Sequence, residues 1–407
     1  MLLLGLILLI VAVLGYYRYR DFFAPVVISS LSWGGVALLY ALLNHGMEPI
    51  SLKGLSVLGL WNLSLITGAF LFSEVNLKDS SCGNLRSFNP WVRDSFFKIS
   101  LLGMIPMCYM AYKIGTTMLS GSFLLNLRMA NTGLVESEFR YGVFEYVFPV
   151  AFVSFLIELL IYRNDKPRTR LYVLAFLNVI IMFITMAKST ILFTILSALV
   201  IVNFKRRISS RKMLWCGMVI FAFMASFQLL RSGGDDAGDT ISDMFYVYTL
   251  GGVPALDQIV NSEMTSETKG QYMFAFFHNA VSKLEGEKKR PEKTHKNDLT
   301  DEHGYVFVPL PTNVYTVVGP VWIDYGWLGV LLGGLMTGSF AGIFFRLARK
   351  GFLWAVIVYA YFTCVLLLQF FGEYVFTNLS YLIQIILLSL FAYKFKYVVK
   401  WQKSTSF

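Results

Sequence analysis

The sequence predicts an all-α integral membrane protein that crosses the bilayer many times. Of the 407 residues, 56% are hydrophobic and only 15% are charged, with a mean hydropathy of +0.60, whereas soluble domains carry about 25% charged residues. Apolar segments of about the length of a bilayer span recur along almost the whole chain. Lys and Arg are concentrated in alternate loops between these segments. These three observations exclude a water-soluble globular protein and a disordered chain.

The expected membrane spans are eleven apolar segments. No basic residue precedes the first segment, and Arg18 and Arg20 follow it, so we expect a retained helix rather than a cleavable signal peptide. The sixth and seventh segments are separated only around Lys188. In chain order, the expected spans are residues 1–17, 22–43, 55–75, 96–114, 141–162, 171–187, 189–204, 213–230, 317–345, 352–371 and 375–395.

The distribution of basic residues predicts the orientation of the chain. Six loops on one side of the expected spans hold 21 Lys and Arg residues, and four short loops on the other side hold 4. Since cytoplasmic loops carry the excess of basic residues, we expect a cytoplasmic C-terminus and an N-terminus on the outer face. Residues 1–407 then form one polytopic domain, in which residues 231–316 are a large periplasmic loop. The net charge of +10 is explained by these basic loops, so nucleic acid is not an expected partner.

The large loop contains two kinds of segment. Residues 283–303 are strongly charged and are expected to be solvated. Residues 244–260 and 270–281 are aromatic and apolar, so they are expected either to lie on the membrane surface or to pack over the helices as a lid. The Gly-Gly-Asp-Asp stretch at 233–236 is typical of ordinary turns. No Cys/His ligand set is present, and we expect no metal and no cofactor.

Three basic residues at the outer edges of separate spans are the first candidate site. They are Arg128, Lys188 and Arg231. Ionisable residues at membrane depth are costly and are often functional, although each of these side chains could simply extend to the interface. The simplest partner for outer-face cations is an anion at the membrane surface, such as a lipid pyrophosphate.

Small residues mark one late span. The stretch from Gly333 to Gly338 contains three glycines and a threonine, a pattern that allows close helix packing. We therefore expect this face to contact another helix.

The segment 311–329 carries the most specific pattern in the chain. Thr312, Asn313, Tyr315 and Thr316 open a late span, and Asp324, Tyr325, Gly326 and Gly329 follow. This arrangement resembles the C-terminal signature of O-antigen polymerases of the Wzy type, which are oligosaccharide repeat-unit polymerases. The segments YTLGGVPALDQ at 248–258 and AKSTIL at 187–192 are also similar to that family.

The resemblance implies a multi-pass enzyme of lipopolysaccharide biosynthesis in the bacterial inner membrane. Such proteins are glycosyltransferases with a fold like that of the C type, and they need no metal, cofactor or nucleotide sugar. They use undecaprenyl-pyrophosphate-linked oligosaccharide as donor and acceptor, within the lipid bilayer. They transfer the growing glycan to the non-reducing end of another lipid-linked repeat unit. A chain-length regulator of the same pathway is a further candidate partner.

The resemblance also assigns roles to residues of this chain. Arg128, Arg140, Lys188 and Arg231 become candidates for binding the pyrophosphate, and Thr312, Asn313 and Tyr315 become candidates for binding sugar or phosphate. From the residues themselves, Asp324 is the first catalytic candidate, either ordering Arg or Lys or acting as base, and His278 is a second candidate base. The candidate residues are therefore Arg128, Arg140, Lys188, Arg231, His278, Thr312, Asn313, Tyr315 and Asp324.

Three other functions remain open at this stage. An O-antigen ligase shares the donor but uses a lipid A core as acceptor. A capsule or exopolysaccharide polymerase shares the whole reaction. A polysaccharide transporter or flippase is a non-enzyme alternative, although transporters tend to show repeated halves and the sequence has no internal repeat.

Overall fold

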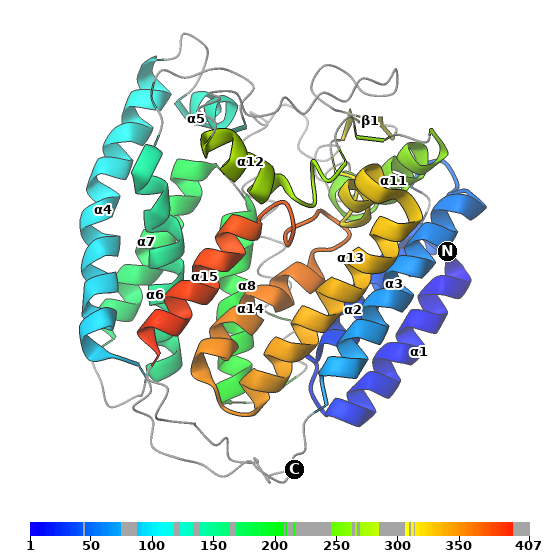
Figure 1. Cartoon of the computed structure of the whole chain (residues 1–407), viewed down its shortest axis with the longest axis horizontal. Coiled ribbons are helices and arrows are strands. Elements are labelled where there is room, and N and C mark those ends of the chain that lie inside the picture. The colour runs from blue at the N-terminus through cyan, green and yellow to red at the C-terminus, as the bar shows by residue number, and fades with distance from the viewer. Residues whose placement is uncertain are drawn as a thin grey trace. The chain divides into compact units, whose positions relative to one another are not determined.

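The computed structural model describes most of the chain (Figure 1). The described residues are 1–43, 45–74, 88–117, 123–132, 139, 141–162, 168–186, 188–206, 208, 209, 215, 246–262, 265, 266, 269–284, 306–308, 311, 312 and 314–393.

Helices account for nearly all of the regular structure in these ranges. Ten of them coincide with expected spans: α1 (Leu2–Tyr19), α2 (Pro25–Leu42), α3 (Leu52–Phe72), α4 (Pro90–Thr117), α6 (Val147–Ile161), α7 (Thr169–Thr185), α8 (Lys188–Lys205), α13 (Val318–Arg349), α14 (Leu353–Leu367) and α15 (Leu379–Ala392). Shorter elements lie between them: α5 (Phe123–Thr132), the 3-10 helix η2 (Gly142–Tyr146), α11 (Gly252–Asn261) and α12 (Ala275–Leu284). Two short strands, β1 (Val306–Phe307) and β2 (Pro311–Thr312), form an antiparallel pair that the sequence did not predict.

The chain is an all-α, multi-pass membrane protein by the length and composition of its helices. Within the described residues, six helices are long and apolar enough to cross a membrane, and four shorter apolar helices accompany them. The expected fold class is confirmed at this level. The number of eleven spans stays a prediction, and the expected span at 213–230 lies almost entirely outside the described residues.

Local chemistry explains where several helices begin and end. Pro25 occupies the first turn of α2, where its missing N–H costs nothing. Ser51 caps α3, because its hydroxyl accepts the N–H of Gly54 at 3.1 Å. Met186 adopts a left-handed conformation (φ 51°) and ends α7. The predicted division around Lys188 is therefore confirmed.

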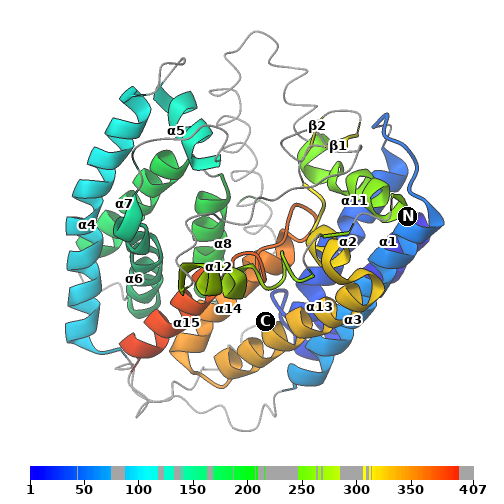
Figure 2. The ribbon, with the colours of Figure 1, turned by 45° about the horizontal axis from the view of Figure 1, so that its top comes forward.

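The described helices belong to two compact units. The first unit comprises residues 1–74, 236–346 and 365–382, and the second comprises residues 75–235, 347–364 and 383–407. In the first unit, α11 lies at the N-terminal end of α3 (Figure 2). In the second unit, α4, α6, α7 and α8 pack side by side, with α5 across the ends of α4 and α7 (Figure 1).

Glycines allow α3 and α13 to approach closely. A Cβ atom on Gly334 would lie 3.0 Å from the carbonyl oxygen of Trp61, and one on Gly338 would lie 2.8 Å from the backbone nitrogen of Ala69. From the other helix, a Cβ on Gly68 would collide with the carbonyl oxygen of Leu335. The small-residue face at 333–338 therefore packs backbone against backbone, as predicted.

Gly338→Leu should destabilise the first unit, because backbone atoms of α3 cannot move away as a flexible side chain could. Overpacking of this kind costs about 1–3 kcal/mol or more. We expect a lower melting temperature of the purified protein in detergent. Gly59→Leu is the matched control, because a Cβ on Gly59 of the same helix pair meets no atom within 4 Å. Equal melting temperatures for the two variants would contradict this account of the packing.

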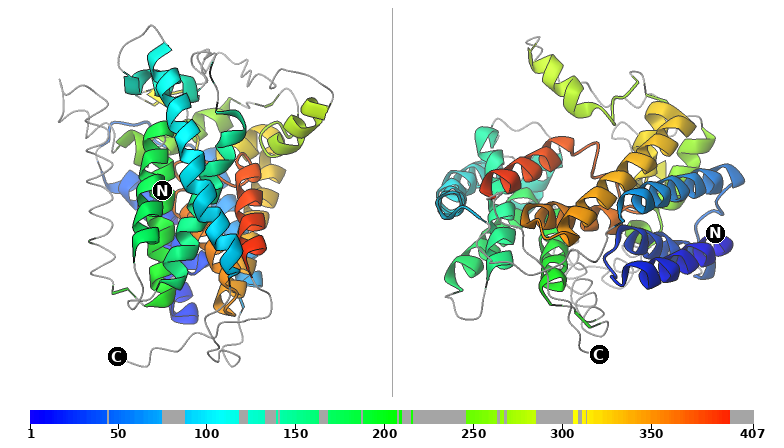
Figure 3. Two further views of the ribbon diagram at one scale, coloured as in Figure 1. Left: turned by 90° about the vertical axis from the view of Figure 1, so that its left-hand side faces the viewer. Right: turned by 60° about the horizontal axis from the view of Figure 1, so that its bottom comes forward.

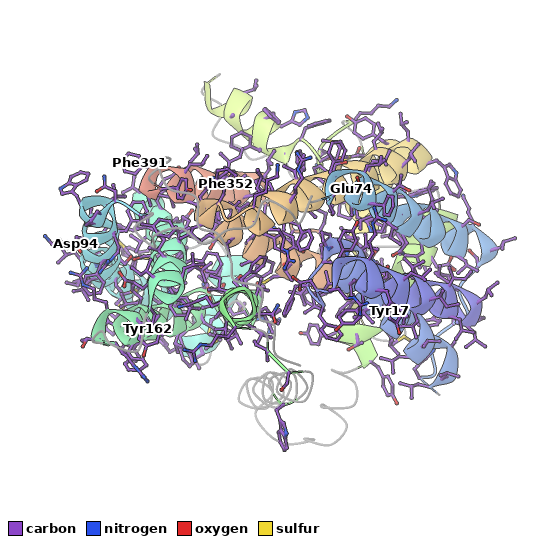
Figure 4. All side chains as sticks on the ribbon, turned by 90° about the horizontal axis from the view of Figure 1, so that it is seen from below. Tyr17, Glu74, Asp94, Tyr162, Phe352 and Phe391 are labelled. Atoms are coloured by element: carbon purple, nitrogen blue, oxygen red, sulfur yellow. The ribbon has the colours of Figure 1, made fainter. Side chains whose placement is uncertain are left out.

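Charged side chains gather at one end of each unit. In the second unit, Arg93 Nε lies 2.7 Å from Glu158 Oε1, and Arg170 pairs with Asp94. Figure 4 views the end at which Asp94 lies. In the first unit, Arg18 at the end of α1 pairs with Glu74 after the end of α3. These ends carry loops that the basic-residue distribution assigns to the cytoplasm.

Reporter fusions test which side of the membrane these ends face. A reporter fused after residue 207 or after Arg349 should report the cytoplasm, and one fused at residue 290 should report the periplasm, because basic loops stay inside. The measurement is a pair of reporters that are active on opposite sides. A cytoplasmic signal at residue 290 would overturn the orientation and every outer-face assignment.

Candidate functional site

In the second unit, α5 is held against one end of each of two apolar helices, α4 and α7. Asn126 Nδ2 donates to the carbonyl oxygen of Gly115 at the end of α4, at 2.9 Å. Asn131 Nδ2 donates to the carbonyl oxygen of Ile184 near the end of α7, also at 2.9 Å. Tyr141 donates its hydroxyl to the same Ile184 carbonyl at 3.1 Å. These bonds satisfy helix-end carbonyls and fix the position of α5.

This arrangement brings together the elements that carry Arg128 and Lys188. Arg128 lies on α5, one turn before Asn131, and its side chain is half-buried. Lys188 is the first residue of α8, four residues after Ile184. Arg140 and Arg231, the other two predicted cations, lie outside the described residues.

The start of α8 suits an anion. The first N–H groups of an α-helix have no partner within the helix and carry the positive end of its dipole. The first turn of α8 has the sequence Lys188-Ser189-Thr190 and contains no acidic residue. Phosphate groups bind readily at such helix ends.

In the first unit, the segment that opens α13 is built from side-chain turns. Thr312 Oγ1 accepts the N–H of Val314, and Thr316 Oγ1 accepts the N–H of Val318, both at 3.1 Å. Thr312 and Thr316 are both buried, so these hydroxyls shape the chain here. Tyr315 is half-buried and packs against the apolar cluster of Ala255, Val306 and Val308. Asn313 lies outside the described residues.

Three segments that are distant in sequence meet beside Thr316. A Cβ on Gly252 would lie 2.7 Å from the carbonyl oxygen of Phe370 and 3.4 Å from the backbone nitrogen of Thr316. Val317 donates its N–H to the carbonyl oxygen of Gln369 at 2.7 Å. The glycine at 252 is therefore required for close approach, and two of the segments that carry the family resemblance lie in contact here.

Gln369 is the centre of this region, and the sequence analysis did not single it out. Its Oε1 accepts the indole N–H groups of Trp33 at 3.2 Å and Trp61 at 2.9 Å. Its Nε2 donates to Ser29 Oγ at 3.0 Å and to the Leu366 carbonyl at 2.7 Å. The side chain is fully buried, so it joins α2, α3 and the end of α14. The sequence feature that could have identified Gln369 is a single amide side chain inside the apolar segment 352–371.

Glu373 holds the connection between α14 and α15. Its Oε1 accepts the N–H groups of Val375 at 2.6 Å and Phe376 at 2.9 Å, and its Oε2 accepts that of Thr377 at 2.6 Å. Burial raises the pKa of the Glu373 carboxyl, against the effect of these donors. We assign Glu373 a structural role, because its own loop surrounds it.

Asp324 lies buried in α13 and binds a segment of the large loop. Its Oδ2 accepts the N–H groups of Tyr272 at 2.9 Å and Met273 at 2.7 Å. Among the described residues, neither Asp324 Oδ1 nor Ser266 Oγ has a partner with hydrogen-bond geometry. His278 is half-buried on α12, and Asp324 binds the segment that leads into this helix. The two predicted catalytic residues therefore lie on segments that contact each other.

The residues after Asp324 explain the spacing of the predicted motif. Gly326 has φ 56° and ψ −136° inside α13, a conformation that only glycine adopts readily. This break in the helix brings Gly329 against the carbonyl oxygen of Val321, where a larger residue would collide. Tyr325 makes an edge-to-face contact with Phe274, with ring centroids 6.2 Å apart. The motif therefore shapes α13 and attaches the loop to it.

The candidate residues fall into two groups by unit. Arg128 and Lys188 belong to the second unit, and Thr312, Tyr315, Asp324 and His278 belong to the first. Their proposed roles stay predictions. Within the described ranges, no group of three or more His, Cys, Asp or Glu residues could hold a metal ion. No protein-family model matches the chain, and neither a curated protein nor a solved structure is significantly similar to it.

Proposed function

We propose that this protein polymerises lipid-pyrophosphate-linked oligosaccharide repeat units at the outer face of the bacterial inner membrane. The observation that carries the proposal is the bond from Asn131 to the carbonyl of Ile184. This bond fixes α5, which carries Arg128, beside the end of α7. Lys188, the first residue of α8, follows shortly after in the sequence. Two cations and a helix N-terminus then act on one anion. A pyrophosphate at the membrane surface is an anion of suitable charge and depth.

The proposed reaction transfers a glycan from undecaprenyl pyrophosphate to a second lipid-linked unit. An acceptor hydroxyl oxygen forms a bond to the anomeric carbon, and the bond from that carbon to the pyrophosphate oxygen breaks. Negative charge develops on the leaving pyrophosphate, so fixed cations stabilise the transition state more than the ground state. Arg128 and Lys188 supply this stabilisation, with Arg231 and Arg140 as the further cations that the sequence predicts.

The acceptor hydroxyl also loses a proton, and His278 is our proposed base. An imidazole is a suitable general base at neutral pH, and Asp324 binds the backbone of the two residues Tyr272 and Met273 on the segment that leads into the helix of His278. Because Oδ2 of Asp324 already accepts two backbone N–H groups, its role is to position the loop. Thr312, Asn313 and Tyr315 remain candidates for contacts with the glycan.

A deletion strain examined for lipopolysaccharide banding tests the proposal. A polymerase deletion should leave single-repeat caps and remove the ladder of longer chains. Complete loss of attached repeats would instead indicate a ligase or a flippase. An unchanged ladder would exclude all three activities in lipopolysaccharide assembly.

A reconstituted assay tests the chemistry directly. The lipid-linked repeat unit that accumulates in the deletion strain is extracted and incubated with the purified protein in liposomes. Longer lipid-linked glycans should appear without added metal, nucleotide sugar or lipid A core. The same wild-type protein should restore the ladder when it is expressed in the deletion strain. If it does so but forms no product in liposomes, a polymerase that acts alone is contradicted.

A further inference from the structure

Helix α12 and Phe274, the residue directly before it, carry an exposed apolar stripe. Phe274, Phe277 and Val281 are 42%, 52% and 51% exposed. They occupy positions i, i+3 and i+7, which lie on one face of a helix. By helical spacing, positions 279 and 283, which are Asn and Lys, fall opposite this stripe, and His278 lies beside it.

The position of α12 is fixed relative to α13. The two N–H groups that bind Asp324 belong to Tyr272 and Met273, which directly precede α12. Phe274 contacts Tyr325 of α13. Figure 3 shows α12 projecting sideways from α13, clear of the other helices of its unit. The apolar stripe is therefore held in place without being packed against the core.

The spanning helix to which α12 is attached also has exposed apolar residues near the attachment. On α13, Trp327, Leu328 and Leu331 are 46%, 58% and 37% exposed, directly after the Tyr325 contact. In a helix that crosses the bilayer, apolar side chains with this exposure face lipid. Because Phe274 contacts Tyr325 close to these residues in the sequence, α12 is attached to α13 near its lipid-facing part.

We propose that α12 lies in the membrane interface, with Phe274, Phe277 and Val281 inserted among the lipids of the outer leaflet. Amphipathic helices bind in this way, with the apolar face at the boundary between headgroups and acyl chains. The aromatic residues suit this depth. A lid would bury the stripe against the protein's own helices, whereas the stripe is exposed here. The inference is independent of the proposed enzymatic activity.

Photocrosslinking in liposomes tests the proposal with the full chain. A benzoylphenylalanine residue replaces Phe277, Val281, Leu328 or Glu48 in separate variants, which are reconstituted with phosphatidylethanolamine and phosphatidylglycerol. Leu328 is the lipid-facing control on α13. Glu48 is the exposed control in the polar loop after α2. Mass spectrometry after illumination detects lipid adducts.

Positions 277 and 281 should form lipid adducts at a level comparable with position 328, and position 48 should form few or none. Crosslinks from 277 and 281 to another segment of the chain, without lipid adducts, would show a lid and overturn the proposal. A lack of any adduct at 277 and 281, with adducts at 328, would also overturn it. If a bulky probe prevents folding, the smaller diazirine analogue of leucine at Val281 gives the same readout.

Discussion

Lys188→Glu should abolish formation of the polysaccharide ladder at a normal level of protein in the membrane. The substitution replaces the cation at the start of α8 with an anion, which would repel the proposed pyrophosphate. It should not unfold the helix, because an acidic residue in the first turn is favourable for the helix dipole. Loss of activity with retained melting temperature therefore separates a binding role from a structural one. The measurements are lipopolysaccharide banding and thermal unfolding of the purified variant.

Milder substitutions of Arg128 and Lys188 should reduce the rate of polymerisation by smaller amounts. Arg128→Ala removes one charge-assisted contact, worth roughly 1.5–3 kcal/mol, which corresponds to about a ten- to hundredfold loss of rate. Arg128→Lys should retain part of the activity, because a cation remains but the bidentate contact is lost. Lys188→Arg should be well tolerated, because it keeps a positive charge at the start of α8.

Two other basic residues serve as controls for charge alone. Lys53→Ala removes a cation from the expected outer side, and Arg349→Ala removes one from the expected cytoplasmic side. Neither change should alter chain length appreciably. If Arg128→Ala and Lys188→Glu gave wild-type ladders at matched protein levels, these cations would be interfacial anchors, and the pyrophosphate assignment would be wrong.

Gln369→Leu should produce the largest loss of stability in the first unit. Leucine has similar size but leaves the indole N–H groups of Trp33 and Trp61 and the hydroxyl of Ser29 without their partner. Each buried polar group left unpaired costs about 1–3 kcal/mol. We expect a strongly lowered melting temperature in detergent and little protein in the membrane.

Companion variants show whether hydrogen bonding is the cause. Gln258→Leu makes the same change on α11, where the amide donates to the carbonyl of Phe307 at 3.1 Å in an exposed hydrogen bond, and should cost much less. Trp33→Phe with Gln369→Leu should recover part of the lost stability, because one unpaired donor is then absent. An unaltered melting temperature for Gln369→Leu would show that the network contributes little to stability.

Hydropathy and loop charge were sufficient to predict the membrane class and the positions of ten described helices. These features are local, since each span must be apolar over its own length and satisfy its own backbone. The glycine-rich face of α13 was also predictable, because small residues at helical spacing have few other uses. The loop between α7 and α8 was predicted correctly from a single interruption around Lys188.

These sequence patterns could not predict contacts between distant segments. Asp324 was singled out as a catalytic candidate, but its bonds to Tyr272 and Met273 depend on how the large loop folds back. Gln369 was not predicted to be important, because one amide in an apolar segment does not indicate its partners Trp33 and Trp61, which are 336 and 308 residues away. Side-chain partners across a fold are set by packing, whereas periodicity along the chain reports only which face of each helix is apolar.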